Sequence, residues 1–327
     1  SLQGSSISIT LLLSPSSGIP RPVEVFRGGP MGFHTKLGIE ESGLCRQTNA
    51  VYGMGARYRG LSESGDDVFV PLGTHGRTLR LVDFHHYVAK LRVEDGAQHF
   101  NDWSAAAAAA RTGRFDPAQA DLEPALRLRE YDLYVDSDRY LDAMLVHASA
   151  LGVRVVRQSP LSAELNAEGM LESVTLDDGS RVQGDFFIDC SEDRFLIRHV
   201  TSEDELCDWS SWFACDRLVS LSAKSQQAPR IFTSIEAHDS GLLTQLSTRA
   251  LATGCFIYNS SSINDEQAVE QLAKTLPGTA PEDAQAAPFR AGRYSRHWEK
   301  NCVALGSAAA VLAPLEVSSL QLAQSAV

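Results

Sequence analysis

The pattern of apolar and polar positions predicts that strands and helices alternate along the chain. Residues 7–13 form an apolar, β-branched run that ends in a Ser/Pro/Gly cluster, which is typical of a buried strand before a loop. Residues 138–151 carry apolar side chains at helical spacing, and Gly152 precedes the next strand-like run. A meander then leads to the run at 186–189, "FFID", which predicts a strand buried on both faces. This order predicts an α/β fold with a mainly parallel sheet.

Two further elements are predicted between these segments. The run "DVFVPLG" at 67–73 predicts a short strand. The segment "NDWSAAAAAARTG" at 101–113 predicts a helix, because alanine has the highest helix propensity. Asp102 is the predicted N-cap of this helix, and Gly113 suits the position just past its end.

The C-terminal half continues the same alternation. Residues 255–261 predict a strand, and residues 265–276 predict a helix whose acidic first turn suits the helix dipole. The last segment, 302–316, predicts a strand that turns into the start of a Gly/Ala-rich helix.

Composition narrows the classes of protein that the chain can belong to. Of 327 residues, 43% are apolar and 21% are charged, which is typical of a globular protein. Lysine and arginine number 29 against 41 acidic residues, so the net charge of −12 repels phosphate backbones and excludes nucleic acid as an expected partner. No stretch approaches the roughly 20 apolar residues of a membrane span, so no membrane partner is expected.

The cysteines and the first residues predict a compartment. Six cysteines are scattered without a C-x-x-C pair in a chain too long to need disulfide staples, which predicts reduced thiols. The first residues, "SLQGSSISIT", lack the charged and long apolar regions of a signal peptide. We therefore expect a cytoplasmic protein.

Five segments carry a resemblance to a known family. They read, in order, "FFIDCSEDR", "FTSIEAHDSG", "GCFIYNSSSINDEQA", "GRYSRHWEKNCVALG" and "APLEVSSL". Their order and spacing resemble the flavin-dependent tryptophan halogenases. The resemblance implies a Rossmann-type sheet domain like that of FAD monooxygenases, with a β-rich substrate layer. It suggests a flavoprotein-type domain at 1–200, a substrate-side layer at 201–300 and a return to the flavin domain at 301–327.

The resemblance also implies a chemistry and a set of site residues. In such enzymes reduced flavin forms a hydroperoxide, halide attacks it to give hypohalous acid, and a lysine relays the oxidant to an indole ring. Glu316 occupies the place of the proposed catalytic base, and Ser318 and Ser319 occupy the places that hold halide. The implied cofactor is FAD, and the implied substrate is an indole-like aromatic molecule. The implied FAD-binding positions are Asp189, Ser191, Arg194, Gly306 and Pro314.

Departures from the family pattern are concentrated at the site. Gly53 stands where the resemblance places the relay lysine, and Val70 stands where it places a histidine. The family's two tryptophans are also replaced, because the four defined positions of that motif fall on Leu242, Thr244, Leu246 and Ser247. Framework positions that still match include Asp189, Arg194, Trp209, Arg217, Arg293, Trp298 and Asn301.

The second departure from the family pattern is the lack of a phosphate-binding loop. A dinucleotide fold needs a strand followed by G-x-G-x-x-G at the start of a helix. We expect this N-terminal unit to be lacking, because the run at 7–13 matches the family's second strand. The segment "GMGARY" at 53–58 has Tyr58 in place of the third glycine and follows no clear strand.

Other groupings favour ordinary structural roles. In "DFHHY", Asp83, His85 and His86 lack a third ligand at metal-site spacing, and adjacent histidines on a strand would point to opposite faces, so no metal is expected. No G-x-S-x-G elbow marks a nucleophile. Three tyrosines are expected to be core or surface aromatics, namely Tyr131, Tyr134 and Tyr140.

Two hypotheses of function follow. The first is a tryptophan-halogenase-like protein that has lost FAD binding and halogenation and serves as a binding or partner subunit. Its partner would be an active halogenase paralogue or a second copy, docked on an exposed sheet edge. The alternative is an active FAD-dependent halogenase or monooxygenase that acts on an indole-like aromatic substrate.

Overall fold

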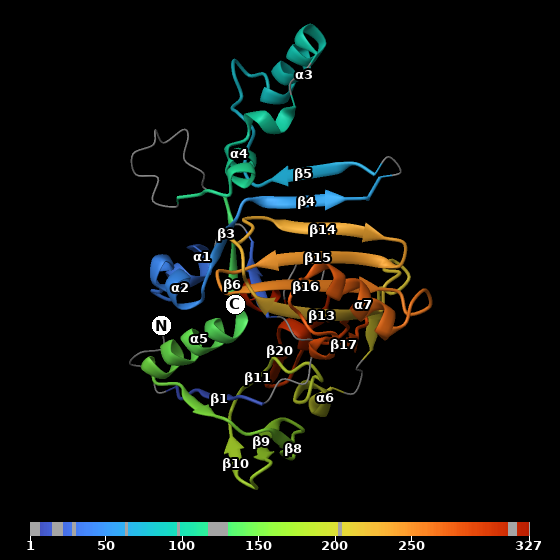
Figure 1. Cartoon of the computed structure of the whole chain (residues 1–327). Coiled ribbons are helices and arrows are strands. Elements are labelled where there is room, and N and C mark those ends of the chain that lie inside the picture. The colour runs from blue at the N-terminus through green and yellow to red at the C-terminus, as the bar shows by residue number, and fades with distance from the viewer. Residues whose placement is uncertain are drawn as a thin grey trace. The chain divides into compact units, whose positions relative to one another are not determined.

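The computed structural model of the chain divides into two compact units (Figure 1). It describes residues 7–14, 22–27, 31–62, 65–96, 99–116, 130–201, 205–312 and 319–326. Unit 1 comprises Ser1–Pro20, Asp138–Leu218 and Ala286–Val327, and unit 2 comprises Arg21–Ser137 and Val219–Gln285. The domain bounds suggested by the resemblance stay a prediction.

Unit 1 is built from short strands and three helices in its described residues. Strand β1 (Thr10–Leu12) pairs in parallel with β7 (Arg154–Val156). Strand β11 (Phe187–Asp189) pairs in parallel with β20 (Cys302–Ala304), and β19 (Trp298–Glu299) adds an antiparallel edge. The remaining strands of unit 1 are β8 (Pro160–Leu165), β9 (Leu171–Leu176), β10 (Arg181–Gln183), β12 (Leu206–Asp208), β18 (Gly292–Tyr294) and β21 (Ala310–Val311). Its helices are α5 (Ser137–Ala150), α6 (Ile197–Val200) and α8 (Ser319–Ala326).

Unit 2 centres on a seven-stranded sheet whose order is β17-β13-β16-β15-β14-β4-β5 (Figure 1). The strands are β17 (Gln285–Pro288), β13 (Arg217–Lys224), β16 (Leu251–Tyr258), β15 (Gly241–Ser247), β14 (Thr233–His238), β4 (Gly55–Arg59) and β5 (Asp67–Pro71). A second sheet of three strands has the order β2 (Val23–Phe26), β6 (Asp132–Asp136) and β3 (Val51–Gly53). The helices are α1 (Met31–Lys36), α2 (Glu41–Gln47), α3 (Phe84–Asp95), α4 (Ala105–Thr112) and α7 (Asp265–Thr275).

Separate apolar clusters stabilise the two units. In unit 1, side chains of β9, β11, α6 and β20 pack together, including Leu176, Phe187 and Ile197. In unit 2, one cluster joins the three-stranded sheet to α4 through Val51, Tyr134 and others. Another packs α7 on the seven-stranded sheet. Burial of apolar area of this kind is the dominant favourable term in folding.

The predicted α/β fold is confirmed and contains a large sheet, and the strand predicted at 67–73 and the helix predicted at 265–276 fall close to their observed bounds. The predicted parallel pairing is found in unit 1, where β1 pairs with β7 and β11 pairs with β20 in parallel. The large sheet of unit 2 is mixed. Its β4 and β14 are parallel, but β14 with β15, β15 with β16, and β4 with β5 are antiparallel. Short hairpin connections favour antiparallel pairs of this kind.

Four local predictions are corrected. The alanine helix α4 is capped by Ser104, which accepts a bond from the Ala107 N–H, and Asp102 instead belongs to the preceding 3-10 turn. Residues 84–95 form helix α3 and not a strand. Residues 306–308 form a 3-10 turn followed by β21 instead of a long helix start. The run at 186–189 is not buried on both faces, because Phe186 and Ile188 are exposed.

Candidate functional site

The loop after β11 holds a buried carboxylate that organises the backbone around it. Asp189 is only 1% exposed. Its Oδ1 accepts bonds from the N–H (2.9 Å) and the hydroxyl (2.6 Å) of Ser191. Its Oδ2 accepts bonds from the N–H groups of Leu196 (2.8 Å) and Ile197 (2.9 Å) at the start of α6. A buried carboxylate needs such donors, and here the chain itself supplies them.

Arg194 is the second buried charge of this loop, with 2% of its surface exposed and a positive φ of 57°. Its guanidinium donates to the backbone carbonyls of Ala308 and Arg296. It also lies 3.6 Å from the centre of the Tyr294 ring, a cation–π contact. The arginine therefore ties the loop to the C-terminal segment of unit 1.

Gly306 lies next to the loop that follows β11. β20 lies beside β11, and the Leu305 N–H donates to the Asp189 carbonyl at 2.8 Å. Gly306 follows with φ of 59°, a left-handed conformation that suits glycine. The structure thus brings Asp189, Ser191, Arg194 and Gly306 together at the carboxyl ends of two parallel strands, where α/β folds place ligands.

The other predicted site residues are not described. Pro314, Glu316 and Ser318 lie outside the described residues, and of Ser319 only the backbone is described, at the first position of α8. The assignments of base and halide site stay predictions.

Position 53, the predicted place of the relay lysine, lies at the end of β3 in unit 2. β3 runs beside β6 (Figure 1). Val51 of β3 is the register partner of Tyr134. A Cβ atom added to Gly53 would lie 2.5 Å from Oη and 2.8 Å from Cε1 of Tyr134, and closer still to Cζ. The Tyr134 ring therefore fills the space into which any side chain at position 53 would begin.

Tyr134 is fixed in this place. Its side chain is fully buried in the cluster that joins the three-stranded sheet to α4. Its hydroxyl shares a hydrogen bond of 2.9 Å with Oγ1 of Thr233, which is also buried. Moving the ring aside would break this bond and disturb the packed cluster. The expectation that Tyr134 is a core aromatic is confirmed.

A polar cluster adjoins this position and was missed by sequence reasoning. Tyr131 donates to the Glu41 carboxylate at 2.8 Å, and Tyr52 donates to it at 3.3 Å. Cys45 lies 3.5 Å from the Tyr52 hydroxyl. Burial raises the pKa of both phenols, and a hydrogen bond adds to the rise, from Cys45 at Tyr52 and from Glu41 at Tyr131. The only signal in the sequence was Glu41 in the segment "GIEESGLC", whose partner Tyr131 lies 90 residues away.

The remaining departures also fall on ordinary strands. Val70 lies on the edge strand β5 with its side chain exposed. The four positions of the tryptophan motif lie along β15. The segment "GMGARY" enters β4 with no helix after it, so it has no phosphate-binding geometry.

The paired histidines lie on a helix and not on a strand. His85 and His86 are consecutive in α3, with ring centroids 4.0 Å apart. Within the described residues, no three His, Cys, Asp or Glu side chains gather closely enough to hold a metal ion.

Comparison with known proteins identifies the family. The family model described as tryptophan halogenase matches residues 1–327. The chain belongs to the tryptophan halogenase family. Among curated relatives of this family, the tryptophan 7-halogenase KtzQ of Kutzneria sp. (strain 744) is 26% identical over 97% of this chain and 63% of its own length.

Solved halogenases share the fold. BrvH, a flavin-dependent halogenase from Brevundimonas sp. BAL3, superposes with a TM-score of 0.89 at 28% identity, over 99% of this chain and 65% of BrvH. Xcc4156, a flavin-dependent halogenase from Xanthomonas campestris, gives 0.88 at 26% identity, over 99% of this chain and 65% of its own. The chain thus spans less than two thirds of the length of these halogenases.

FAD is the cofactor that the halogenase family implies. The side chains of Asp189 and Arg194 do not fit direct contact with it, because both are buried and bonded to the chain's own backbone. Contacts from the backbone of this loop to FAD stay a prediction.

The chain contains six cysteines, all of them in described residues and all of them present as thiols and not as disulfides. No helix in the described parts of the chain combines the length and the apolarity that crossing a bilayer requires.

Proposed function

We propose that this chain is a tryptophan-halogenase-like protein that has lost lysine-relayed halogenation and serves as a binding or partner subunit. The observation that carries the proposal is the filled space at position 53. A relay needs an amine on a side chain, and glycine has none. The Tyr134 ring occupies the start of the path that a lysine side chain would take.

Because the Tyr134 ring fills this space, replacing Gly53 by lysine would not be enough to restore the relay. A glycine in an open pocket could regain a lysine by one substitution without strain. Here an added Cβ would clash with a ring that is buried and hydrogen-bonded to Thr233. Overpacking of this kind costs about 1–3 kcal/mol before the rest of the lysine side chain is placed. Restoring the amine therefore requires a second change at Tyr134.

The surface of unit 1 supports a partner role. Phe186 and Trp298 lie with ring centroids 6.0 Å apart, and Trp298 is 63% exposed. Ile188 is exposed on β11 of the same sheet, where β20 lies between β11 and the strand of Trp298. Exposed apolar groups that lie together are a feature of protein–protein contact sites.

One observation favours the alternative, an active FAD-dependent halogenase or monooxygenase. The loop of Asp189, Ser191 and Arg194 keeps a fully bonded arrangement next to Gly306. If the loop had lost every role, its residues would be free to change, unless the loop is needed for folding.

Flavin binding and turnover separate the two functions. The protein is titrated with FAD and followed by flavin absorbance and fluorescence, and it is then supplied with reduced flavin, oxygen, bromide and an indole panel. We expect no halogenated product by mass spectrometry under conditions in which an active family member, run in parallel, gives product. Stoichiometric flavin with halide-dependent turnover would overturn the proposal. A variant that combines Gly53→Lys with Tyr134→Leu tests whether the missing amine is the limiting group.

A further inference from the structure

A tight turn in unit 2 presents a leucine to solvent. The backbones of Leu79 and Val82 exchange two hydrogen bonds, of 3.0 and 2.9 Å, and enclose Arg80 and Leu81. These two residues have φ of 48° and 66°, both in the left-handed region. Turns of this shape normally use Asn-Gly or Asp-Gly, because side chains other than glycine, asparagine and aspartate are disfavoured there. We call Arg77 and residues 79–82 the tip.

The tip is held in this shape by bonds on both sides. The Thr78 hydroxyl donates to Asp83 at 3.0 Å, and the Tyr87 hydroxyl of α3 donates to the Leu79 carbonyl at 2.9 Å. Leu81 is nevertheless 99% exposed, so it contributes no apolar burial within this chain. A strained backbone that is fixed and that projects an apolar side chain into water is a reason to look for a function.

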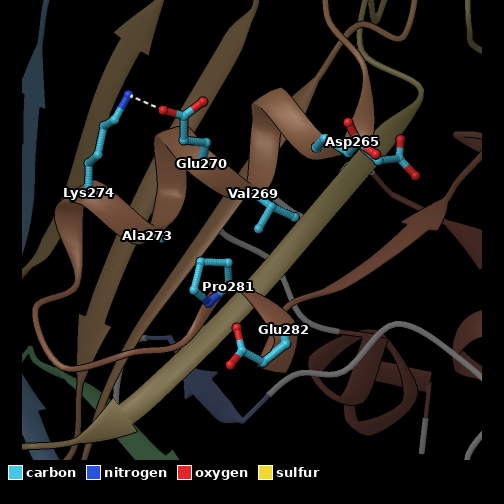
Figure 2. Close-up of a pocket in the computed structure, with 8 residues that line it drawn as sticks. Asp265, Val269, Glu270, Ala273, Lys274, Pro281 and Glu282 are labelled. Atoms are coloured by element: carbon cyan, nitrogen blue, oxygen red, sulfur yellow. Dashed lines mark ion pairs between the residues drawn. The ribbon is translucent and has the colours of Figure 1, made fainter.

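A groove in the same unit has complementary chemistry. It lies between α7 and the 3-10 turn η2 (Pro281–Asp283) and has a volume of about 660 Å³ (Figure 2). Its apolar part is formed by Val269, Ala273 and Pro281. The charged residues that line it are Asp265, Glu266, Glu270, Glu282 and Lys274.

The charge of the groove is strongly acidic. Lys274, its one cation, is engaged by Glu270 at 2.9 Å, as the dashed line in Figure 2 shows. Glu266 and Glu282 line the groove and are exposed. An apolar floor bordered by carboxylates fits a segment that combines an apolar side chain with arginines. The tip, with Leu81 between Arg80 and Val82 and with Arg77 nearby, is such a segment.

We propose that the tip of one copy docks into the groove of a second copy. Leu81 contacts Val269, Ala273 and Pro281 of the second copy, and Arg77 and Arg80 face its Glu266 and Glu282. The contact joins two different surfaces, so it is a head-to-tail contact. This inference goes beyond the proposed function and does not depend on it, since neither surface includes Gly53 or Tyr134.

The test uses the whole chain and three variants. Leu81→Asp alters the tip, and aspartate tolerates the left-handed conformation. Glu266→Lys combined with Glu282→Lys alters the groove at two exposed positions. Val93→Asp, at an exposed position of α3, is the matched control for a new charge outside the tip. Self-association is measured by sedimentation velocity over a range of concentration and at low and high salt.

The wild-type chain and Val93→Asp are expected to associate as concentration rises, and less so at high salt. Leu81→Asp is expected to weaken association by roughly ten- to a hundredfold, the equivalent of burying one leucine. The groove variant is expected to lose association as well. An equimolar mixture of the two altered chains is expected to form a dimer, because one supplies an intact groove and the other an intact tip.

Three results would overturn the proposal. The first is a wild-type chain that stays monomeric at every concentration. The second is association that Leu81→Asp leaves unchanged. The third is a mixture of the two altered chains that does not form dimers, which would indicate a symmetric contact or a different surface. None of these results bears on flavin binding or halogenation, so failure here leaves the proposed function standing.

Discussion

The loop after β11 and position 53 differ in what happened to the residues of the halogenase pattern. In the loop the pattern's aspartate and arginine are kept, and their side chains hold the backbone together: Asp189 accepts four hydrogen bonds and Arg194 joins distant carbonyls. At position 53 the prescribed lysine is replaced, and Tyr134 fills its space. A residue that also supports the fold is needed whether or not the chemistry is kept, whereas a residue that serves chemistry alone is free to change once the chemistry is lost.

The comparison changes how retention of a motif should be interpreted. Buried polar groups are costly to leave without partners, so the bonding of Asp189 and Arg194 is reason enough to keep both. Retention of this motif is therefore weak support for flavin chemistry in this chain. The state of position 53 is more informative, because no contact of the fold requires a lysine there.

The largest expected effect is at Arg194. Arg194→Leu removes the donors to Ala308 and Arg296 and the stacking on Tyr294. We expect the free energy of unfolding to fall by about 3 kcal/mol, because the buried carbonyl of Ala308 and the part-buried carbonyl of Arg296 lose their partner. Chemical denaturation followed by circular dichroism measures it. Arg198→Leu, at an exposed arginine of α6, is the control and should cost less than about 0.5 kcal/mol. Equal costs would mean that the loop is not held by Arg194.

A smaller loss is expected at Asp189. Asp189→Asn keeps the size of the side chain but places an amide NH₂ where one oxygen now accepts two N–H or O–H bonds. We expect a loss of about 1–3 kcal/mol, the usual cost of unsatisfied buried donors. Thermal unfolding measures the change. An unchanged melting temperature would contradict the structural role given to this carboxylate and leave cofactor binding as the better explanation for its retention.

The sequence predicted the fold well where local patterns suffice. The strand at 67–71 and the helix at 265–275 appear close to their expected bounds, since periodicity and caps are local signals. The left-handed turn at Arg80 and Leu81 could not be predicted, because neither residue is a turn former. The filling of position 53 was equally hidden. Gly53 and Tyr134 are far apart in sequence, and only the pairing of β3 with β6 brings them together.

The smallest expected effect is a difference in the rate at which individual cysteines are alkylated. Cys302, fully buried on β20 beside the loop, has its pKa raised to about 12 by burial, with a further rise from Asp189. Because the thiolate is the reactive form, the folded protein near pH 8 should label at the exposed Cys207 and not at Cys302. Mass spectrometry after alkylation measures this order. Labelling of Cys302 at a rate close to that of Cys207 would show that the region beside the loop opens readily.

The most direct measurement of the central claim, that Tyr134 fills the place of the relay side chain, is a double-mutant cycle between positions 53 and 134. Gly53→Ala should destabilise the wild-type chain by about 1–3 kcal/mol, since its Cβ meets the ring. In a Tyr134→Leu background, which removes the end of the ring, the same substitution should cost much less, whereas Tyr134→Phe, which keeps Cζ and Cε1, should give no such relief. Equal costs of Gly53→Ala in the wild-type and Tyr134→Leu backgrounds would contradict the claim.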